Sequence, residues 1–248
     1  MLYPVEIKAN IDGNVADALE RLGNPGGATN RSIWFAEDRD GLANGELRLL
    51  KGGVIIRVRS GEGHDDTTAK LRPCDPTQLQ DGWTDAFDRN GVEYRIEGDW
   101  SGPRHTLAAS AVSTFGQGSQ AQVGGTPLHE QALTSGQTDF LAQCAKVPVS
   151  VSNLIALGPI ASTKWSDVKV GDVEVDAERW IVADLDFLEL SIRAKPKDHD
   201  KAGDFEARAR KHQARLLEAI DGVGLQIAAD TDNKTQRVLT TLAGLAHQ

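Results

Sequence analysis

Polar and hydrophobic residues alternate along several short stretches of this chain. The alternation is clearest in VEIKANI at 5–11, VIIRVRS at 54–60, TAKLRP at 68–73, VEYRIEGDW at 92–100 and FLELSIRA at 187–194. Side chains two residues apart on a β-strand point to the same face of the sheet. The pattern therefore predicts strands that carry charged side chains on one face and Val, Ile and Leu on the other.

The remaining pattern predicts helices between and after these strands. The apolar stripe of 204–220 repeats at helical spacing and is followed by Gly222, which can end a helix. Turn residues between two basic strands predict a hairpin joined by a polar loop at 61–66. The expected strands are 2–11, 32–36, 54–60, 67–72, 93–100, 106–115, 153–165, 168–176 and 181–194; the expected helices are 14–22, 77–90 (weakly), 138–146, 204–220 and one starting near Asp232; 47–50 fits either type. This order indicates an α+β protein whose antiparallel, mostly meandering sheet has helices packed outside it.

The composition and the net charge indicate which classes of binding partner this chain is not expected to have. The chain has 248 residues, a formal net charge of −9 and a pI of about 5.2. Such an acidic surface repels nucleic acids and anionic membranes, so neither DNA nor a membrane is an expected partner. Cys74 and Cys144 lack the spacing of a metal finger, and the N-terminus lacks a basic head with an apolar stretch. We expect a cytoplasmic protein with two reduced cysteines.

Two of the strands carry only basic residues on their polar face. Arg57 and Arg59 lie in one, and Lys70 and Arg72 in the next. A single such pair is what any solvated strand face shows. If the two stretches form a hairpin, however, four cations crowd together, and like charges on paired strands are unfavourable. An anion between them would relieve the repulsion, so the pattern favours a site for a compact polyanion.

Several motifs in order resemble the CYTH family, the triphosphate tunnel metalloenzymes. VEIK resembles the family's N-terminal E-x-E-x-K strand, and GELRLLKGGVIIRVRSGEG its R-x-R strand; TTAKLRP, EYRIEGDW, LGPIASTKW, DFLELSIRA and the segment 233–235 resemble later segments. The resemblance implies that residues 1–248 form a single tunnel domain. It also implies that an eight-stranded antiparallel β-barrel, open at both ends, encloses inward-pointing Glu, Lys and Arg.

The resemblance further implies the role of each candidate residue. Relatives bind triphosphates with Mg²⁺ or Mn²⁺, and hard carboxylate oxygens suit such ions. Arginine binds phosphate oxygens in a bidentate fork. The expected metal-binding residues are Glu6, Glu97 and Glu189; the expected triphosphate-binding residues are Lys8, Arg57, Arg59, Lys70, Arg72, Arg95, Lys164, Arg193 and Lys234; catalysis is assigned to Glu6, Lys8 and Glu189. Asp99 either lines the tunnel or faces water, and Asp176 is expected to face water.

Two departures from the family pattern remove carboxylates. Pro4 stands where the first N-terminal Glu belongs, and Ser191 where the second late Glu belongs. We therefore expect one metal rather than two, or a different substrate. The expected function is metal-dependent hydrolysis of inorganic triphosphate or a nucleoside triphosphate by a monomer or homodimer. A class IV-type adenylyl cyclase and a polyphosphate- or nucleotide-binding module with weakened catalysis are the alternatives.

Overall fold

The computed structural model describes residues 2–80, 82–121, 132–229 and 234–246. The chain divides into two compact units, each built from separate stretches of sequence. Unit 1 comprises Met1–Thr29, Glu97–Thr106 and Ser162–Thr231, and unit 2 comprises Asn30–Ile96, Leu107–Ala161 and Asp232–Gln248. Strands β6, β7 and β8 contribute residues to both units, and the first residue of β2, Thr29, belongs to unit 1.

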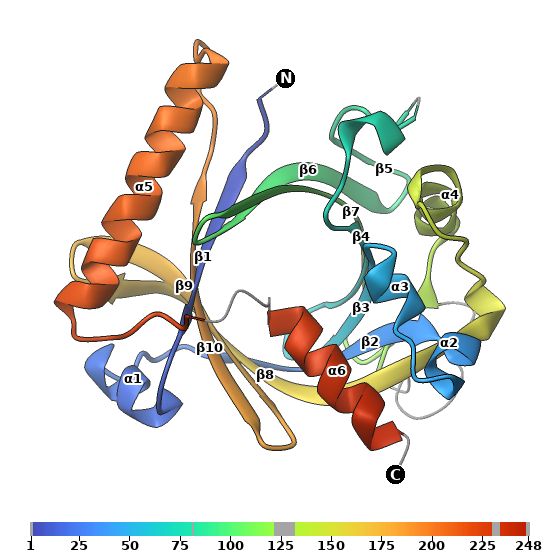
Figure 1. The fold of residues 1–248 in the computed structure, drawn as a ribbon, viewed down its shortest axis with the longest axis horizontal. Coiled ribbons are helices and arrows are strands. Elements are labelled where there is room, and N and C mark those ends of the chain that lie inside the picture. The colour runs from blue at the N-terminus through green and yellow to red at the C-terminus, as the bar shows by residue number, and fades with distance from the viewer. Residues whose placement is uncertain (1, 81, 122–131, 230–233, 247–248) are drawn as a thin grey trace. The chain divides into compact units, whose positions relative to one another are not determined.

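Unit 1 is a sheet with two helices. Its elements are β1 (Val5–Ile11), β9 (Val173–Val182), β10 (Leu185–Ala194), the second parts of β6 (Val92–Ser101) and β8 (Leu154–Val170), the start of β7 (Arg104–Phe115), α1 (Val15–Arg21) and α5 (Ala202–Gly222). β10 pairs with β9 and with β1 in antiparallel fashion, whereas β1 pairs with β6 in parallel. α5 lies along β1, β9 and β10 (Figure 1).

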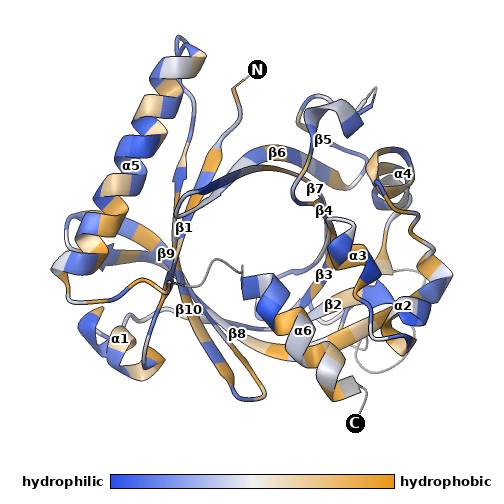
Figure 2. Cartoon of the chain, in the orientation of Figure 1, coloured by the Kyte–Doolittle hydropathy of each residue, from blue (hydrophilic) through white to orange (hydrophobic). Residues whose placement is uncertain are grey.

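The hydrophobic core of unit 1 lies on one face of this sheet. Val5, Ile7 and Ala9 of β1 are buried together with Leu216 and Ile220 of α5. The intervening residues of β1 are only partly buried, so the alternation in VEIKANI sorts its apolar side chains to the helical face. Figure 2 shows hydrophilic and hydrophobic residues alternating along α5 and the strands.

Unit 2 contains the remaining strands and four helices. Its elements are β2 (Thr29–Asp38), β3 (Val54–Gly61), β4 (Asp65–Leu71), β5 (Phe87–Arg89), most of β7, the first parts of β6 and β8, α2 (Arg39–Ala43), α3 (Arg48–Lys51), α4 (Ser135–Cys144), α6 (Lys234–Ala246) and the 3₁₀ turns Pro76–Gln78 and Val151–Asn153. β2, β3, β4 and β7 follow one another as antiparallel neighbours.

Helix α4 covers the apolar face of the unit 2 sheet. Gln137, which is fully buried, donates from Nε2 to the carbonyls of Thr67 on β4 (2.7 Å) and Ala111 on β7 (3.0 Å). Phe140 packs against Tyr94 of β6 with ring centroids 5.4 Å apart. Arg57, Arg59 and Lys70 occupy the alternate positions of their strands, so they point to the opposite face.

The α+β class is confirmed, with two corrections to the expected sheet. The described chain has ten strands in the order β1-β10-β9-β8-β2-β3-β4-β7-β6-β5, rather than eight. β1 and β6 also pair with each other, so nine strands are linked in a closed order of pairings. This last pairing is parallel, so the expectation of a wholly antiparallel sheet was wrong.

Local differences from the expected elements have simple causes. The weakly helical stretch 77–90 forms a single 3₁₀ turn and then β5. The polar loop predicted at 61–66 is shorter, because Asp65 and Asp66 belong to β4 despite their turn-like composition. The expected start of the last helix near Asp232 lies outside the described residues, and its described part begins at Lys234. None of the helices in the described ranges combines the length and apolar character needed to cross a bilayer.

Candidate functional site

The predicted phosphate-binding residues of β3 and β4 share one face of unit 2. Arg57 lies opposite Thr68, Arg59 opposite Asp66, and Lys70 opposite Ile55. Each cation therefore has a neutral or acidic residue directly opposite it on the neighbouring strand. We had expected the cations of the two strands to face one another directly, and they do not. Arg57 donates to the hydroxyl of Thr68 at 3.3 Å, which orients its guanidinium along the sheet.

Asp66 joins two guanidinium groups at the end of this face. Arg59 donates from Nε to the Asp66 carboxylate at 2.9 and 3.1 Å, and Arg31 of β2 donates from Nη1 at 3.1 Å. Asp66 is 5% exposed, so its charge is shielded from water. Sequence reasoning missed both residues: Arg31 directly precedes the expected strand 32–36, and Asp66 lies in the expected loop 61–66.

Three further predicted cations lie in unit 2. Arg72 directly follows β4, and its N–H continues the ladder by donating to the carbonyl of Gly53 at 2.7 Å. Arg95 of β6 forms a half-exposed ion pair with Glu93, which offsets its charge. Lys234, the first residue of α6, is 5% exposed.

The charged face of unit 1 contains the predicted carboxylates. Lys8 places its ammonium 2.8 Å from Glu6 and 2.9 Å from Asp99 of β6. Glu6 lies directly beside Asp99 in the parallel β1–β6 register, so the two carboxylates share Lys8. The sequence left open whether Asp99 lies among the predicted site residues or faces water. Its side chain is 9% exposed and contacts Lys8, so it lies among the predicted site residues.

The other members of this face extend across β10, β9 and β8. Arg193 donates to Glu97 at 2.5 Å, and Lys164 lies 2.8 Å from Asp176. Asp176 is 42% exposed, in keeping with the expectation that it faces water, although it pairs with a predicted cation.

Two glutamates lie directly opposite each other on neighbouring strands of this face. Glu189 of β10 is in register with Glu178 of β9 on one side and with Asn10 of β1 on the other. Ser162 donates to Glu178 at 3.0 Å. Sequence reasoning missed Glu178, although its two-residue spacing from Asp176 in VEVDAERW was a usable signal.

The carboxylates of unit 1 fit a divalent cation in chemistry. Within the described residues, no three His, Cys, Asp or Glu side chains are gathered as a preformed cage. Mg²⁺ does not require one, because it commonly takes one or two carboxylates and completes its shell with water and phosphate oxygens. Glu178 and Glu189 supply such a pair, and like charges directly opposite each other favour an intervening cation.

The two faces differ in their balance of charge. On β2, β3 and β4 the unit 2 face combines Arg31, Arg57, Arg59 and Lys70 with the carboxylate of Asp66, while on β6 the carboxylate of Glu93 is paired with Arg95. The unit 1 face combines six carboxylates (Glu6, Glu97, Asp99, Asp176, Glu178 and Glu189) with three cations (Lys8, Lys164 and Arg193). Within an acidic chain, the first face is suited to an anion and the second to a cation.

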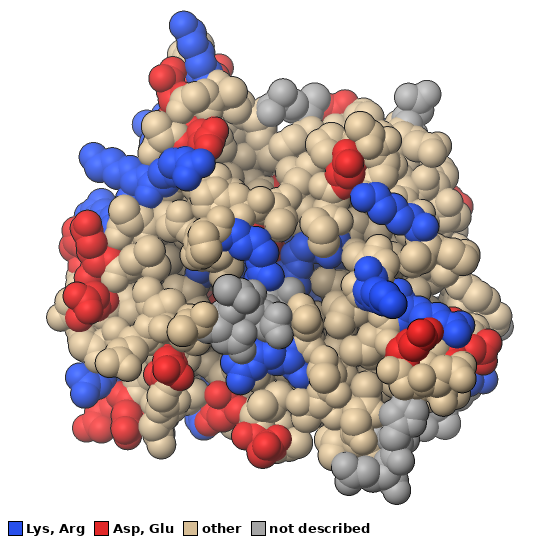
Figure 3. All heavy atoms as spheres, viewed as in Figure 1, with Lys and Arg blue, Asp and Glu red and all other residues tan. Residues whose placement is uncertain are grey.

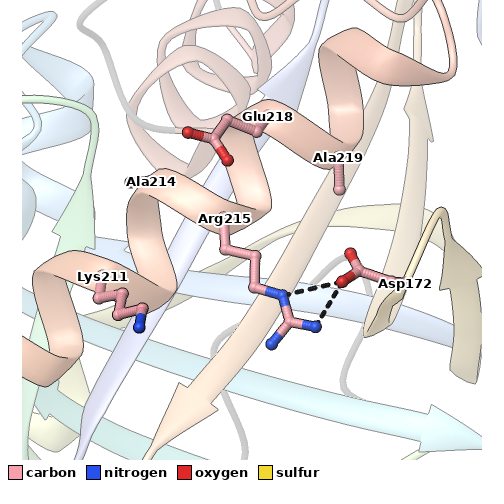
Figure 4. Close-up of a pocket in the computed structure, with 6 residues that line it drawn as sticks. All are labelled: Asp172, Lys211, Ala214, Arg215, Glu218 and Ala219. Atoms are coloured by element: carbon pink, nitrogen blue, oxygen red, sulfur yellow. Dashed lines mark hydrogen bonds and ion pairs between the residues drawn. The ribbon is translucent and has the colours of Figure 1, made fainter.

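A groove beside α5 has a different character. It lies between α5 and the turn that joins β8 to β9, and Arg215 points across it to Asp172, donating from Nε at 3.1 Å (Figure 4). Figure 3 shows Lys or Arg and Asp or Glu side chains interspersed over α5. Arg215 and Asp172 are both more than half exposed, so their ion pair adds little to stability. Because the pair is neutral as a whole, the groove shows no preference for a ligand of either charge.

Comparisons with known proteins show which solved structures share this fold. No family model and no curated protein sequence matches the chain. The structure is similar to the candidate adenylyl cyclase HpAC1 from Hippeastrum, with a TM-score of 0.61 and 11% sequence identity. The match covers 97% of this chain and 96% of HpAC1. HpAC1 is described as having a dominant triphosphatase activity. The structure of this chain is also similar to a candidate adenylate cyclase from Bacillus halodurans, with a TM-score of 0.56 and 14% identity over 95% of this chain and 98% of that one.

These similarities span nearly the whole of each chain at very low sequence identity, so they establish the fold. The chain has the fold of these adenylyl cyclase-like and triphosphatase proteins, consistent with the CYTH domain that its motifs indicate.

Proposed function

We propose that this protein is an enzyme that hydrolyses a triphosphate, either inorganic triphosphate or a nucleoside triphosphate, with the help of Mg²⁺ or Mn²⁺. The observation that carries the proposal is the face of unit 2, where Arg31, Arg57, Arg59 and Lys70 gather on neighbouring strands beside the carboxylate of Asp66. Guanidinium groups fixed by neighbouring strands bind phosphate oxygens with little reorganisation. The triphosphatase activity described for HpAC1 supports the same class of reaction.

The carboxylates of unit 1 supply ligands for the divalent metal that the proposed reaction requires. In the proposal, Glu6 and Glu189 bind the metal, and Glu178 adds a carboxylate in place of the one lost at Ser191. On β6, Glu97 and Asp99 supply carboxylates beside the position of Pro4. A bound divalent cation would neutralise phosphate charge and lower the pKa of a bound water.

The remaining residues bind and orient the substrate. Arg57 and Lys70 hold nonbridging phosphate oxygens, and the Thr68 hydroxyl keeps the Arg57 guanidinium in place. Lys8, held between Glu6 and Asp99, carries its positive charge at a fixed position next to the carboxylates. Such fixed charges stabilise the negative charge of phosphoryl transfer in the transition state.

The test is a phosphate-release assay with tripolyphosphate, ATP, GTP and thiamine triphosphate in the presence of Mg²⁺ or Mn²⁺. Arg57→Ala and Lys70→Ala are expected to abolish metal-dependent release. Arg179→Gln is the matched control, because Arg179 pairs with Asp186 across the β9–β10 hairpin on the face opposite the carboxylates. Unchanged turnover in the two β3–β4 variants would refute the proposal.

An adenylyl cyclase is the second candidate, because both similar structures are described as candidate cyclases. A cyclase converts ATP to cyclic AMP and pyrophosphate, whereas a triphosphatase releases orthophosphate. Quantifying both products from the same ATP reaction separates the two activities. Tight binding of tripolyphosphate without either product under both metals would instead favour the weakened binding module, which the losses at Pro4 and Ser191 suggest.

A further inference from the structure

We infer that Arg31 and Arg59, held by the shared carboxylate of Asp66, form a two-arginine subsite for one phosphoryl group of a tripolyphosphate chain. The inference rests on the proposed function and adds to it a binding residue, Arg31, and a positioning residue, Asp66. All three residues belong to unit 2 and lie on adjacent strands β2, β3 and β4.

The geometry leaves donors of both guanidinium groups directed away from Asp66. Arg59 contacts the carboxylate through Nε and Nη2, and Arg31 contacts it through Nη1 while its Nε donates to the carbonyl of Glu62 at 3.1 Å. Each arginine has five N–H donors in a fixed fork, so donors remain on each for a further anion. The side chains are 23% and 25% exposed, so the groups are held yet accessible.

Glycine at two positions allows Arg31 to reach Asp66 from two strands away. A β-carbon on Gly61 would lie 2.7 Å from the carbonyl oxygen of Asn30, and one on Gly63 would lie 3.2 Å from Nη2 of Arg31. Both glycines also have positive φ angles, 143° and 82°, which other residues rarely adopt. The turn between β3 and β4 is therefore shaped so that the Arg31 guanidinium can pack against it.

A second buried carboxylate makes this end of the hairpin rigid from the other side. Asp65 is fully buried and accepts hydrogen bonds from the Ser60 hydroxyl at 3.0 Å and from the backbone N–H of Gln120 at 2.7 Å. These hydrogen bonds hold the pKa of Asp65 below its ordinary value despite its burial. Asp65 and Asp66 point to opposite faces, so the turn is fixed on one face while the two arginines are fixed on the other.

The charge of the cluster selects its ligand. Arg31 and Arg59 together carry one charge more than the Asp66 carboxylate that they share, and Arg57 lies two residues from Arg59 on the same face. A phosphoryl group offers several oxygens at the spacing that guanidinium forks bind. A linear tripolyphosphate could place one phosphoryl group here and continue along the face toward Arg57.

The experiment measures tripolyphosphate binding by calorimetry without divalent metal, in the full chain and its variants. Arg31→Gln is expected to weaken binding about tenfold and to reduce its dependence on salt, because one charge-assisted contact is lost. Arg31→Lys should recover part of the affinity, since lysine keeps the charge but not the fork. Arg179→Gln is the control and should leave binding unchanged. Arg179 and Asp186 form a pair across another hairpin and are seven residues apart in the sequence, as Arg59 and Asp66 are.

Asp66→Asn tests the positioning role. If Asp66 orients the two arginines, the variant should bind tripolyphosphate more weakly and should raise KM more than it lowers kcat, although a negative charge has been removed. Tighter binding would show that Asp66 competes with phosphate and would overturn its positioning role. Should this variant fail to fold, as judged by circular dichroism and thermal unfolding, the partly exposed Arg31 still tests the subsite.

The inference and the proposed function can fail separately. If Arg57→Ala abolishes binding while Arg31→Gln binds as the unmodified protein does, the subsite is refuted and the proposed function stands. If both variants bind tripolyphosphate normally, the proposed function fails as well.

Discussion

The ammonium of Lys8 on β1 lies 2.9 Å from the carboxylate of Asp99 on β6, a strand more than ninety positions later in the sequence. Both side chains are largely buried, at 13% and 9% exposure, and Glu6 lies 2.8 Å from the same ammonium. The parallel pairing of β1 with β6 creates this contact. It brings a carboxylate beside a strand whose first expected glutamate is replaced by Pro4.

Asp99→Asn is therefore expected to lower both stability and activity. Lys8 would keep Glu6 but lose its second carboxylate in a poorly solvated position, at a cost of about 1–3 kcal/mol. Urea unfolding, with a double-mutant cycle that includes Lys8→Met, measures the coupling between the two side chains. Additive effects of the two substitutions would show that the contact contributes nothing.

Removal of Glu178 or Glu189 is expected to raise the Mg²⁺ concentration needed for half-maximal phosphate release. Glu178→Gln and Glu189→Gln each leave one carboxylate of the opposed pair, so metal affinity should fall about tenfold or more.

Metal titration followed by phosphate release checks this expectation for each variant. Glu218→Gln, on the exposed side of α5, provides a control with the same chemical change. Unaltered metal dependence in both site variants would remove this pair from the proposed metal site.

His212 on α5 is expected to make the protein less stable as the pH falls. Partial burial, followed by the positive charges of Arg208, Arg215 and Lys211, lowers the pKa of this imidazole in the folded state. The unfolded chain then binds more protons than the folded chain below about pH 6.5, so the free energy of unfolding decreases with falling pH. Urea unfolding between pH 7.5 and 5.5 should show a steeper loss for the unmodified protein than for His212→Gln; equal slopes would contradict this.

Cys74 is expected to react slowly with thiol reagents in the folded protein. Burial, reinforced by the nearby Cys144, raises the pKa of its thiol to about 11. The reactive thiolate is therefore scarce at pH 8, and access is restricted. A disulfide-exchange reagent such as Ellman's reagent should react slowly in buffer and rapidly in urea, whereas fast labelling of the native protein would show that this region opens readily.

Much of the sheet could be predicted from short-range pattern. The alternation in VEIKANI and VIIRVRS correctly assigned Glu6 and Lys8 to the face opposite Ile7, and Arg57 and Arg59 to the face opposite Ile56 and Val58. The 204–220 pattern likewise predicted α5, which extends two residues further at each end. These features follow from periods of 2 and 3.6 residues, which only neighbouring positions determine. The turn-like composition of 61–66, by contrast, concealed the start of β4, since pairing with β3 and β7 overrides local preference there.

By itself, the sequence determined which side chains share a face of a strand, because that depends only on the alternation of the backbone. It also determined the excess of acid over base in the whole chain. Only the tertiary structure decided which charges meet across strands: Arg31 and Arg59 at Asp66, Lys8 at Asp99, and Glu178 opposite Glu189. Strand register and the parallel β1–β6 pairing depend on packing between segments far apart in the chain, and no local pattern encodes those contacts.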